Sequence, residues 1–75
     1  MSALPDEFAE MLARVLEPGQ EEAAAEIIEA ATMLDDEGLR VFLRLFAGRV
    51  RESGAPVRSE ELRTFLQRAA GAGAP

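Results

Sequence analysis

The chain has 75 residues, no cysteine, no histidine and a formal net charge of −6 at pH 7. A chain this short holds one hydrophobic core, which barely offsets the conformational entropy lost on folding. The missing residue types exclude disulfides, thiolate nucleophiles, the usual zinc sites and the most common general base.

The first predicted helix covers about residues 5–16. Pro5 suits the first helical position, and the acidic residues Asp6 and Glu7 suit the positive N-terminal end of the helix dipole. The turn-forming pair Pro18-Gly19 ends the segment. The apolar residues that recur at helical spacing are Phe8, Met11, Leu12, Val15 and Leu16.

The second predicted helix covers about residues 20–34 and is amphipathic. Glutamates at positions 22, 26 and 29 lie on one side, and small or aliphatic residues lie on the other. Because several of these are alanines, we expect close contact with a neighbouring helix. The apolar side contains Ala23, Ala24, Ile27, Ile28, Ala31 and Leu34.

The third predicted helix covers about residues 35–52 and is the most apolar segment. Asp35 is a suitable N-cap, and Gly54 stands where a helix C-terminus favours glycine. On a helical wheel, one broad arc of apolar residues predicts the face that packs in the core. This arc contains Leu39, Phe42, Leu43, Phe46 and Val50.

The fourth predicted helix covers about residues 60–70, with Ser59 as its expected N-cap. Its inward residues are predicted to be Leu62, Phe65, Leu66 and Ala69. We therefore expect a single domain over residues 1–70 and a frayed tail over residues 71–75. The predicted fold is all-α, a compact bundle of four short helices completed by dimerisation.

The acidic residues do not form a recognisable catalytic or metal site. Most adjacent pairs, such as Glu21/Glu22 and Glu60/Glu61, fall in the first turn of a predicted helix, where the macrodipole favours negative charge. Around Gly54, an EF-hand reading would place Arg49 and Arg51 at ligand positions, which argues against calcium. With no glycine-rich phosphate loop and no activated nucleophile, we predict no enzymatic activity, no cofactor, no metal and no small-molecule substrate.

The third helix carries a second apolar strip beside its arginines. Arg40, Arg44 and Arg51 lie within about 40° of one another on the wheel. Val41 and Leu45 lie outside the core arc, with Gly48 between them and the arginines. Three explanations remain open: burial within the bundle, self-association, or contact with a nucleic acid or an acidic membrane. The candidate interaction surface is Arg40, Val41, Arg44, Leu45, Gly48, Arg49 and Arg51.

The charge is strongly polarised along the chain. Residues 1–38 hold eleven acidic residues and one arginine, a net charge of −10, whereas residues 39–75 carry a net charge of +4. These halves can attract each other within one chain or between two chains in an antiparallel pair. We therefore predict a non-catalytic protein–protein interaction module with a regulatory or adaptor role, paired with itself or with another protein.

Two alternative functions remain. One is a DNA-associated transcriptional regulator that uses the third and fourth helices, although the pI near 4.5 disfavours nucleic acid as a partner. The other is an acidic inhibitor that docks on a basic partner.

The location of the protein is also predicted from composition. No secretory signal pattern precedes Pro5, and no apolar run has the length of a membrane span, so we expect a cytoplasmic protein with no membrane partner. Alanine is abundant and lysine is absent, which is typical of a GC-rich bacterial genome.

Overall fold

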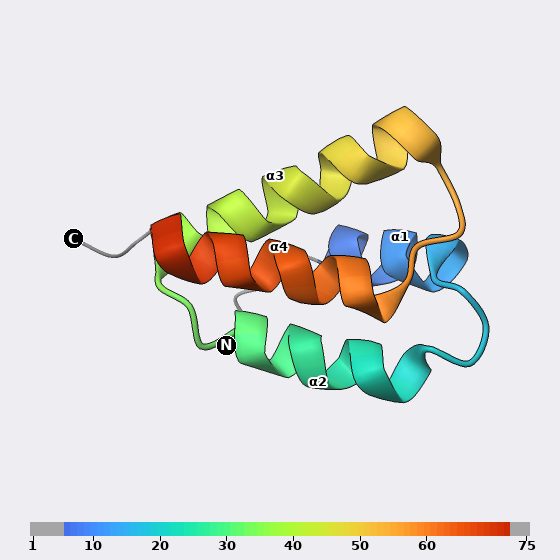
Figure 1. Ribbon diagram of the computed structural model, residues 1–75, viewed down its shortest axis with the longest axis horizontal. Coiled ribbons are helices and arrows are strands. Elements are labelled where there is room, and N and C mark those ends of the chain that lie inside the picture. The colour runs from blue at the N-terminus through green and yellow to red at the C-terminus, as the bar shows by residue number, and fades with distance from the viewer. Residues whose placement is uncertain (1–5, 73–75) are drawn as a thin grey trace.

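The computed structural model describes residues 6–72 and confirms an all-α fold. It contains α1 (Asp6–Val15), α2 (Glu21–Ala31), α3 (Asp36–Ser53) and α4 (Ser59–Ala72). Successive helices run in opposite directions, so α1 and α3 point the same way (Figure 1). The shortest dimension of the molecule is 19 Å, close to the thickness of two packed helices.

The core forms around two phenylalanines of α3. Phe42 and Phe46 are almost completely buried, and the Phe8 ring of α1 lies 5.9 Å and 4.8 Å from their ring centroids. These tilted and edge-on arrangements are the favoured geometries for aromatic pairs. The predicted core arc of α3 is confirmed, because its other members are buried or pack against this cluster.

The ends of the central helices follow the predicted signals with one correction. The Gly38 amide donates to Asp35 Oδ1 at 2.7 Å, which confirms the N-cap, and Gly54 ends α3 with φ 67°. However, α2 ends at Ala31 rather than Leu34, and residues 32–34 form a turn. The chain leaves the helix through i→i+3 bonds, in which the amides of Met33 and Leu34 donate to the carbonyls of Ala30 and Ala31 at 3.0 Å and 3.1 Å.

The start of α4 differs from the prediction that Ser59 is its N-cap. Ser59 is already helical, and the Arg58 carbonyl accepts the first helical bond from the Glu61 amide at 3.0 Å. The Ser59 hydroxyl and amide instead donate to Gln20 Oε1 at 2.6 Å and 3.0 Å. The helix also continues to Ala72, past the predicted end at residue 70; residues 73–75 of the predicted tail and the predicted first residue, Pro5, lie outside the described residues.

A short backbone pairing joins the two loops at one end of the bundle. Leu16 and Val57 form an isolated parallel bridge. The Val57 amide donates to the Val15 carbonyl at 2.7 Å, and the Glu17 amide donates to the Val57 carbonyl at 2.9 Å. Val57 is completely buried. This contact therefore fixes the α3–α4 loop against the end of α1.

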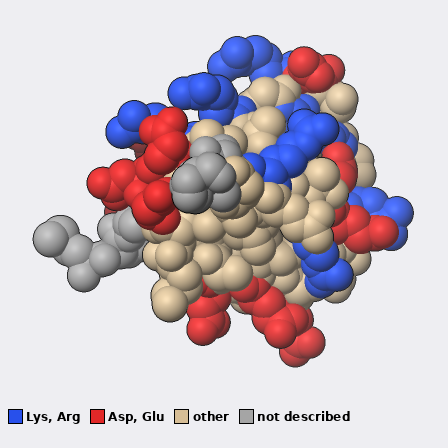
Figure 2. Space-filling model, turned by 60° about the vertical axis from the view of Figure 1, so that its left-hand side comes forward, with Lys and Arg blue, Asp and Glu red and all other residues tan. Residues whose placement is uncertain are grey.

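Few ion pairs join the oppositely charged halves of the chain. Arg58 lies 3.4 Å from Glu17, and Arg40 lies 3.9 Å from Glu37. Figure 2 shows arginines crowded over the top of one face, with acidic side chains mainly at its left and lower edges. Within residues 6–72, the arginines with no carboxylate within 4.0 Å are Arg14, Arg44, Arg51, Arg63 and Arg68.

A glycine sets the distance between α3 and α4 at one end of the pair. A Cβ atom built on Gly38 would lie 3.2 Å from the Ala69 carbonyl oxygen and 3.1 Å from Asp35 Oδ1. Both contacts are tighter than a normal van der Waals separation. The backbones therefore approach closely here because position 38 has no side chain.

The two glycines of α3 should respond to alanine with opposite signs. Gly48 has no atom within 4 Å of its built Cβ, so Gly48→Ala should raise the free energy of unfolding by about 0.5 to 1 kcal/mol through helix propensity. Gly38→Ala should lower it by about 1 to 3 kcal/mol through overpacking. Urea unfolding followed by circular dichroism measures both changes. Equal stabilisation by the two variants would contradict the close contact.

Candidate functional site

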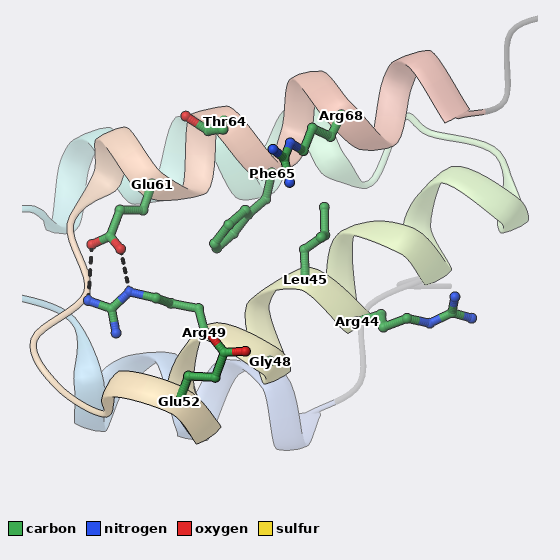
Figure 3. Close-up of a pocket in the computed structure, with 9 residues that line it drawn as sticks. All are labelled: Arg44, Leu45, Gly48, Arg49, Glu52, Glu61, Thr64, Phe65 and Arg68. Atoms are coloured by element: carbon green, nitrogen blue, oxygen red, sulfur yellow. Dashed lines mark hydrogen bonds and ion pairs between the residues drawn. The ribbon is translucent and has the colours of Figure 1, made fainter.

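A groove of about 450 Å³ separates α3 from α4 on the solvent side. Figure 3 shows that its walls come from the second half of α3 and the middle of α4. The lining residues are Arg44, Leu45, Gly48, Arg49, Glu52, Glu61, Thr64, Phe65 and Arg68. The groove is open to solvent along its length, so it suits an extended surface such as a helix better than an enclosed small molecule.

The apolar lining of the groove consists of two partly buried side chains and a glycine. Leu45 and Phe65 point toward the space between the helices (Figure 3), and Gly48 leaves open space where a side chain would project. Val41 packs against the core cluster, as Phe65 also does, but Leu45 does not. The predicted second strip of α3 is therefore divided: Val41 contributes to the core, and Leu45 and Gly48 face the groove.

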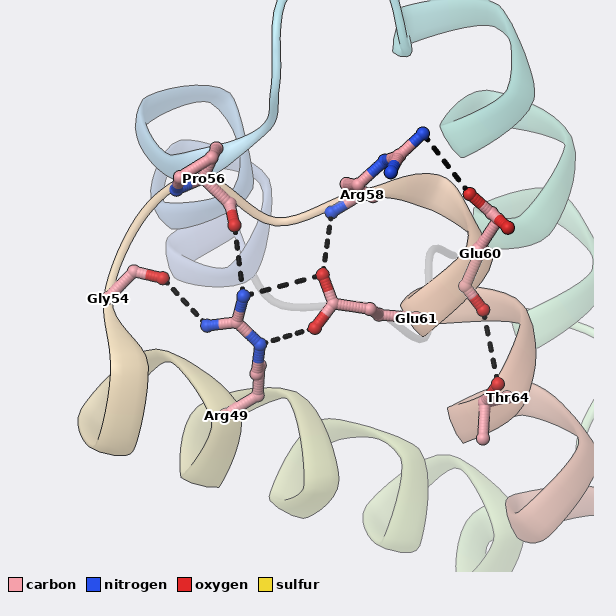
Figure 4. A network of polar contacts seen from close by, with 7 residues as sticks. All are labelled: Arg49, Gly54, Pro56, Arg58, Glu60, Glu61 and Thr64. Atoms are coloured by element: carbon pink, nitrogen blue, oxygen red, sulfur yellow. Dashed lines mark hydrogen bonds and ion pairs between the residues drawn. The ribbon is translucent and has the colours of Figure 1, made fainter.

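Arg49 closes one end of the groove through a network of charge-assisted hydrogen bonds (Figure 4). Its Nε donates to Glu61 Oε1, and its Nη2 lies 3.4 Å from Glu61 Oε2. The same guanidinium donates to the carbonyls of Gly54 at 2.8 Å and Pro56 at 3.0 Å. This forked geometry requires arginine, because an ammonium group cannot contact a carboxylate and two carbonyls in one plane.

The environment of Glu61 lowers the pKa of its carboxyl group. The main cause is the hydrogen bond from Arg49, and the Arg58 amide, which donates at 3.0 Å, acts in the same direction. Partial burial opposes these effects by penalising the charged form. Glu61 is consequently held as a carboxylate that joins α3, the loop and the first turn of α4.

The opposite end of the groove is positively charged. Arg44 and Arg68 are exposed, contribute to its lining, and have no carboxylate within 4.0 Å among residues 6–72. Glu52 lies toward the other end, beside the Arg49 network (Figure 3). The groove therefore runs from two free cations, across an apolar middle, to an additional carboxylate.

The structure brings together four of the seven predicted surface residues. Arg44, Leu45, Gly48 and Arg49 line the groove, whereas the exposed Arg40 and Arg51 and the partly buried Val41 do not. Sequence reasoning missed the opposite wall, formed by Thr64, Phe65 and Arg68, together with Glu52 and Glu61. The acidic Glu61 on the first turn of α4 and the isolated Arg49 were the available signals, but their pairing depends on the tertiary fold.

Residues 6–72 contain no group of three or more Asp or Glu side chains that could hold a metal ion. None of the four helices combines the length and the apolar character needed to cross a membrane.

Comparisons with known proteins provide no assignment. No family model, curated protein or solved structure matches the chain.

Arg49 should contribute strongly to stability. We expect Arg49→Gln to lower the free energy of unfolding by about 2 to 3 kcal/mol, because it removes several charge-assisted bonds and leaves Glu61 without its main partner. Arg51→Gln removes the same charge from an exposed position of α3 and should change stability by less than about 0.5 kcal/mol. Similar effects of the two variants in urea unfolding would contradict the proposed contribution of Arg49.

The lowered pKa of Glu61 predicts a pH-dependent contribution to stability. The folded chain binds this proton less readily than the unfolded chain, so the stabilisation is present above the ordinary Glu pKa of about 4.3 and is lost as pH falls through the lowered folded value. The difference in unfolding free energy between wild type and Glu61→Gln should therefore shrink between about pH 6 and pH 3. An unchanged difference across this range would refute the assignment. In an Arg49→Gln background, the same substitution should have little pH-dependent effect.

Proposed function

We propose that this protein is a non-catalytic protein–protein interaction module that self-associates through the groove between α3 and α4, with an adaptor or regulatory role in the cytoplasm. The single observation that carries the proposal is the groove itself, where apolar Leu45 and Phe65 lie beside two arginines, Arg44 and Arg68, that have no carboxylate within 4.0 Å among residues 6–72. Protein interfaces commonly combine apolar anchors with a polar rim, and arginine is enriched in them.

The small size of the chain supports self-association. A 75-residue domain without disulfides has a limited core, and pairing two copies would bury Leu45 and Phe65 further. The charge asymmetry between the acidic and basic halves adds a source of attraction between identical chains, because each chain carries both complementary surfaces.

The non-catalytic part of the proposal rests on residue types. The chain has no histidine or cysteine, and the most strongly held carboxylate, Glu61, is occupied by Arg49 and the Arg58 amide. A general acid or base must be able to exchange its proton near the operating pH. The lowered pKa of Glu61 does not suit that role at neutral pH.

A DNA-associated role is the second candidate. Its support is the group of arginines on α3 and α4 that lack carboxylate partners among residues 6–72, including Arg51, Arg63 and Arg68. Its weakness is the net charge of −6, together with Glu52 and Glu61 in the groove, which would repel phosphates.

Filling the groove should weaken self-association without unfolding the protein. Gly48→Gln places a long polar side chain in the open space above Gly48 and also improves helix propensity by roughly 0.5 to 1 kcal/mol. We expect the wild type to be a dimer by sedimentation velocity or light scattering, and the dissociation constant of Gly48→Gln to be at least about tenfold higher, a change equivalent to about 1.4 kcal/mol.

Gly71→Gln is the matched control, because Gly71 is exposed on α4 and its built Cβ also meets no atom within 4 Å. This variant should dimerise like the wild type. A wild type that remains monomeric at high concentration would overturn the proposed function. A Gly48→Gln protein that dimerises normally would exclude the groove as the interface.

A further inference from the structure

We infer that two copies of the chain pair groove to groove in an antiparallel dimer, with a two-fold axis that passes close to Gly48 and places Arg44 of each copy against Glu52 of the other. This inference rests on the proposed function, and it identifies the surface that meets the groove as the same surface of a second copy. It follows from the order of charges along α3, from their distances to Gly48, and from the directions of α3 and α4.

The groove side of α3 carries a cation toward one end and a carboxylate toward the other. Arg44 and Glu52 are exposed and line the groove, and neither has an oppositely charged side chain within 4.0 Å among residues 6–72. Leu45 and Gly48 lie between them along the helix. Spacings of three and four residues place these positions on one side of α3. The surface therefore carries both signs of charge, separated by an apolar middle.

The two charges lie at equal distances from Gly48. Arg44 is four residues before Gly48 and Glu52 is four residues after it, so each is about 6 Å from Gly48 along the helix axis. In a two-fold interface, a residue that contacts a second residue is contacted by that residue's copy in return. When two α3 helices run antiparallel and cross at Gly48, both contacts between Arg44 and Glu52 therefore form at once.

A parallel pairing of the two α3 helices lacks this property. A two-fold axis along the helices would place Arg44 beside its own copy and Glu52 beside its own copy, which like-charge repulsion disfavours. The antiparallel orientation is also the one expected from the polarised charge of the sequence. The charges that pair, however, lie within α3 rather than in the acidic and basic halves of the chain.

Gly48 lets the two helices approach closely where they cross. A Cβ atom built at this position meets no atom within 4 Å, so a single chain has room there for a side chain that the sequence does not use. A residue on a two-fold axis faces its own copy, and two glycines allow two helix backbones to come nearer than any other pair of residues. Contact with the partner then offsets the helix propensity that is lost at Gly48.

The directions of the helices extend the contact from α3 to α4. These two helices run in opposite directions within one chain (Figure 1), so an antiparallel pair of α3 helices is accompanied by an antiparallel pair of α4 helices, as in a four-helix bundle. Leu45 and Phe65 point toward the space between the helices (Figure 3). In the dimer, these side chains of both copies meet in the middle of the bundle and exclude water from the groove.

The other charged residues of the groove are compatible with this arrangement. Arg49, which is next to Gly48 in the sequence, is already neutralised by Glu61, so two copies of this ion pair meet near the axis without net charge. Arg68 lies at the same end of the groove as Arg44 (Figure 3) and adds to the attraction for the partner's Glu52. Stable complexes bury at least about 600 Å² on each partner, roughly one eighth of the 5122 Å² surface of one chain.

Charge reversal at positions 44 and 52 tests the arrangement. Arg44→Glu makes residue 44 repel the partner's Glu52, and Glu52→Arg makes residue 52 repel the partner's Arg44. Each single variant should raise the dissociation constant of the dimer at least about tenfold, as measured by sedimentation velocity. A chain with both substitutions should recover most of the lost affinity, because opposite charges face each other again. A one-to-one mixture of the two single variants should form a heterodimer for the same reason.

Arg63→Glu and Glu26→Arg are the matched controls. They make the same charge changes at exposed positions of α4 and α2 that do not line the groove, so both should dimerise like the wild type. Circular dichroism establishes that every variant remains helical. The inference is overturned if the single variants behave like these controls, or if the doubly substituted chain binds itself as weakly as either single variant.

The Gly48→Gln variant separates this inference from the proposed function. If Gly48→Gln weakens the dimer but the charge reversals at positions 44 and 52 do not, the groove remains the interface and only the antiparallel pairing is rejected. A dimer that becomes tighter in Arg44→Glu would indicate parallel pairing and would also overturn the inference. A wild type that remains monomeric would reject both the inference and the proposed function.

Discussion

The relative position of α3 and α4 depends on two contacts of different character at opposite ends of the pair. At one end, Gly38 lets the α3 backbone approach the Ala69 carbonyl closely. At the other end, the long Arg49 side chain spans to Glu61 and to the carbonyls of the connecting loop. A contact with no side chain and a contact through a full-length arginine cannot hold the helices at the same separation. The helices therefore diverge (Figure 1), and the groove is the space between them.

This arrangement also decides which arginines are available to a partner. The Arg49 guanidinium is already hydrogen-bonded to Glu61 and to two loop carbonyls, which requires its forked geometry. Arg58 contacts Glu17 and Glu60. Arg44 and Arg68 line the groove but have no such contacts among residues 6–72. Exposed ion pairs contribute little to stability in water, so the fold loses little by leaving these two cations solvated. In the proposed dimer, their interaction with a partner's carboxylates would become stronger, because water is removed from around both charges.

Local signals in the sequence predicted the helices and their core faces well. The phenylalanines of α3 and the Asp35 cap depend mainly on periodicity and on neighbouring residues, so they were predictable. Ser59 was assigned to the wrong position because its hydroxyl binds Gln20, a residue far away in the chain. The preference of serine for the N-cap reflects hydrogen bonds to backbone amides a few residues away. Here the hydroxyl instead bonds to a residue that is distant in the sequence, and α4 starts one residue earlier than predicted.

The candidate site was predictable only on its α3 side. The helical wheel separated Leu45 and Gly48 from the core arc, but it also grouped Val41 with them, which packs against the core. The α4 wall could not be predicted, because the depth at which Phe65 is buried depends on how far the two helices diverge. That divergence follows from the Arg49 network and the Gly38 contact. The first joins Arg49 to Glu61, twelve residues away, and the second depends on how closely the α3 backbone approaches Ala69.

The two glycines of α3 differ in what offsets their cost to the helix. Glycine within a helix costs roughly 1 kcal/mol relative to alanine, a large fraction of the stability available to so small a domain. At Gly38 the cost is offset by close packing against α4. At Gly48 no atom of the described chain lies where a side chain would project, so the fold gains no packing from its absence. A partner surface that approaches α3 at this point, as the proposed self-association requires, would supply the missing compensation.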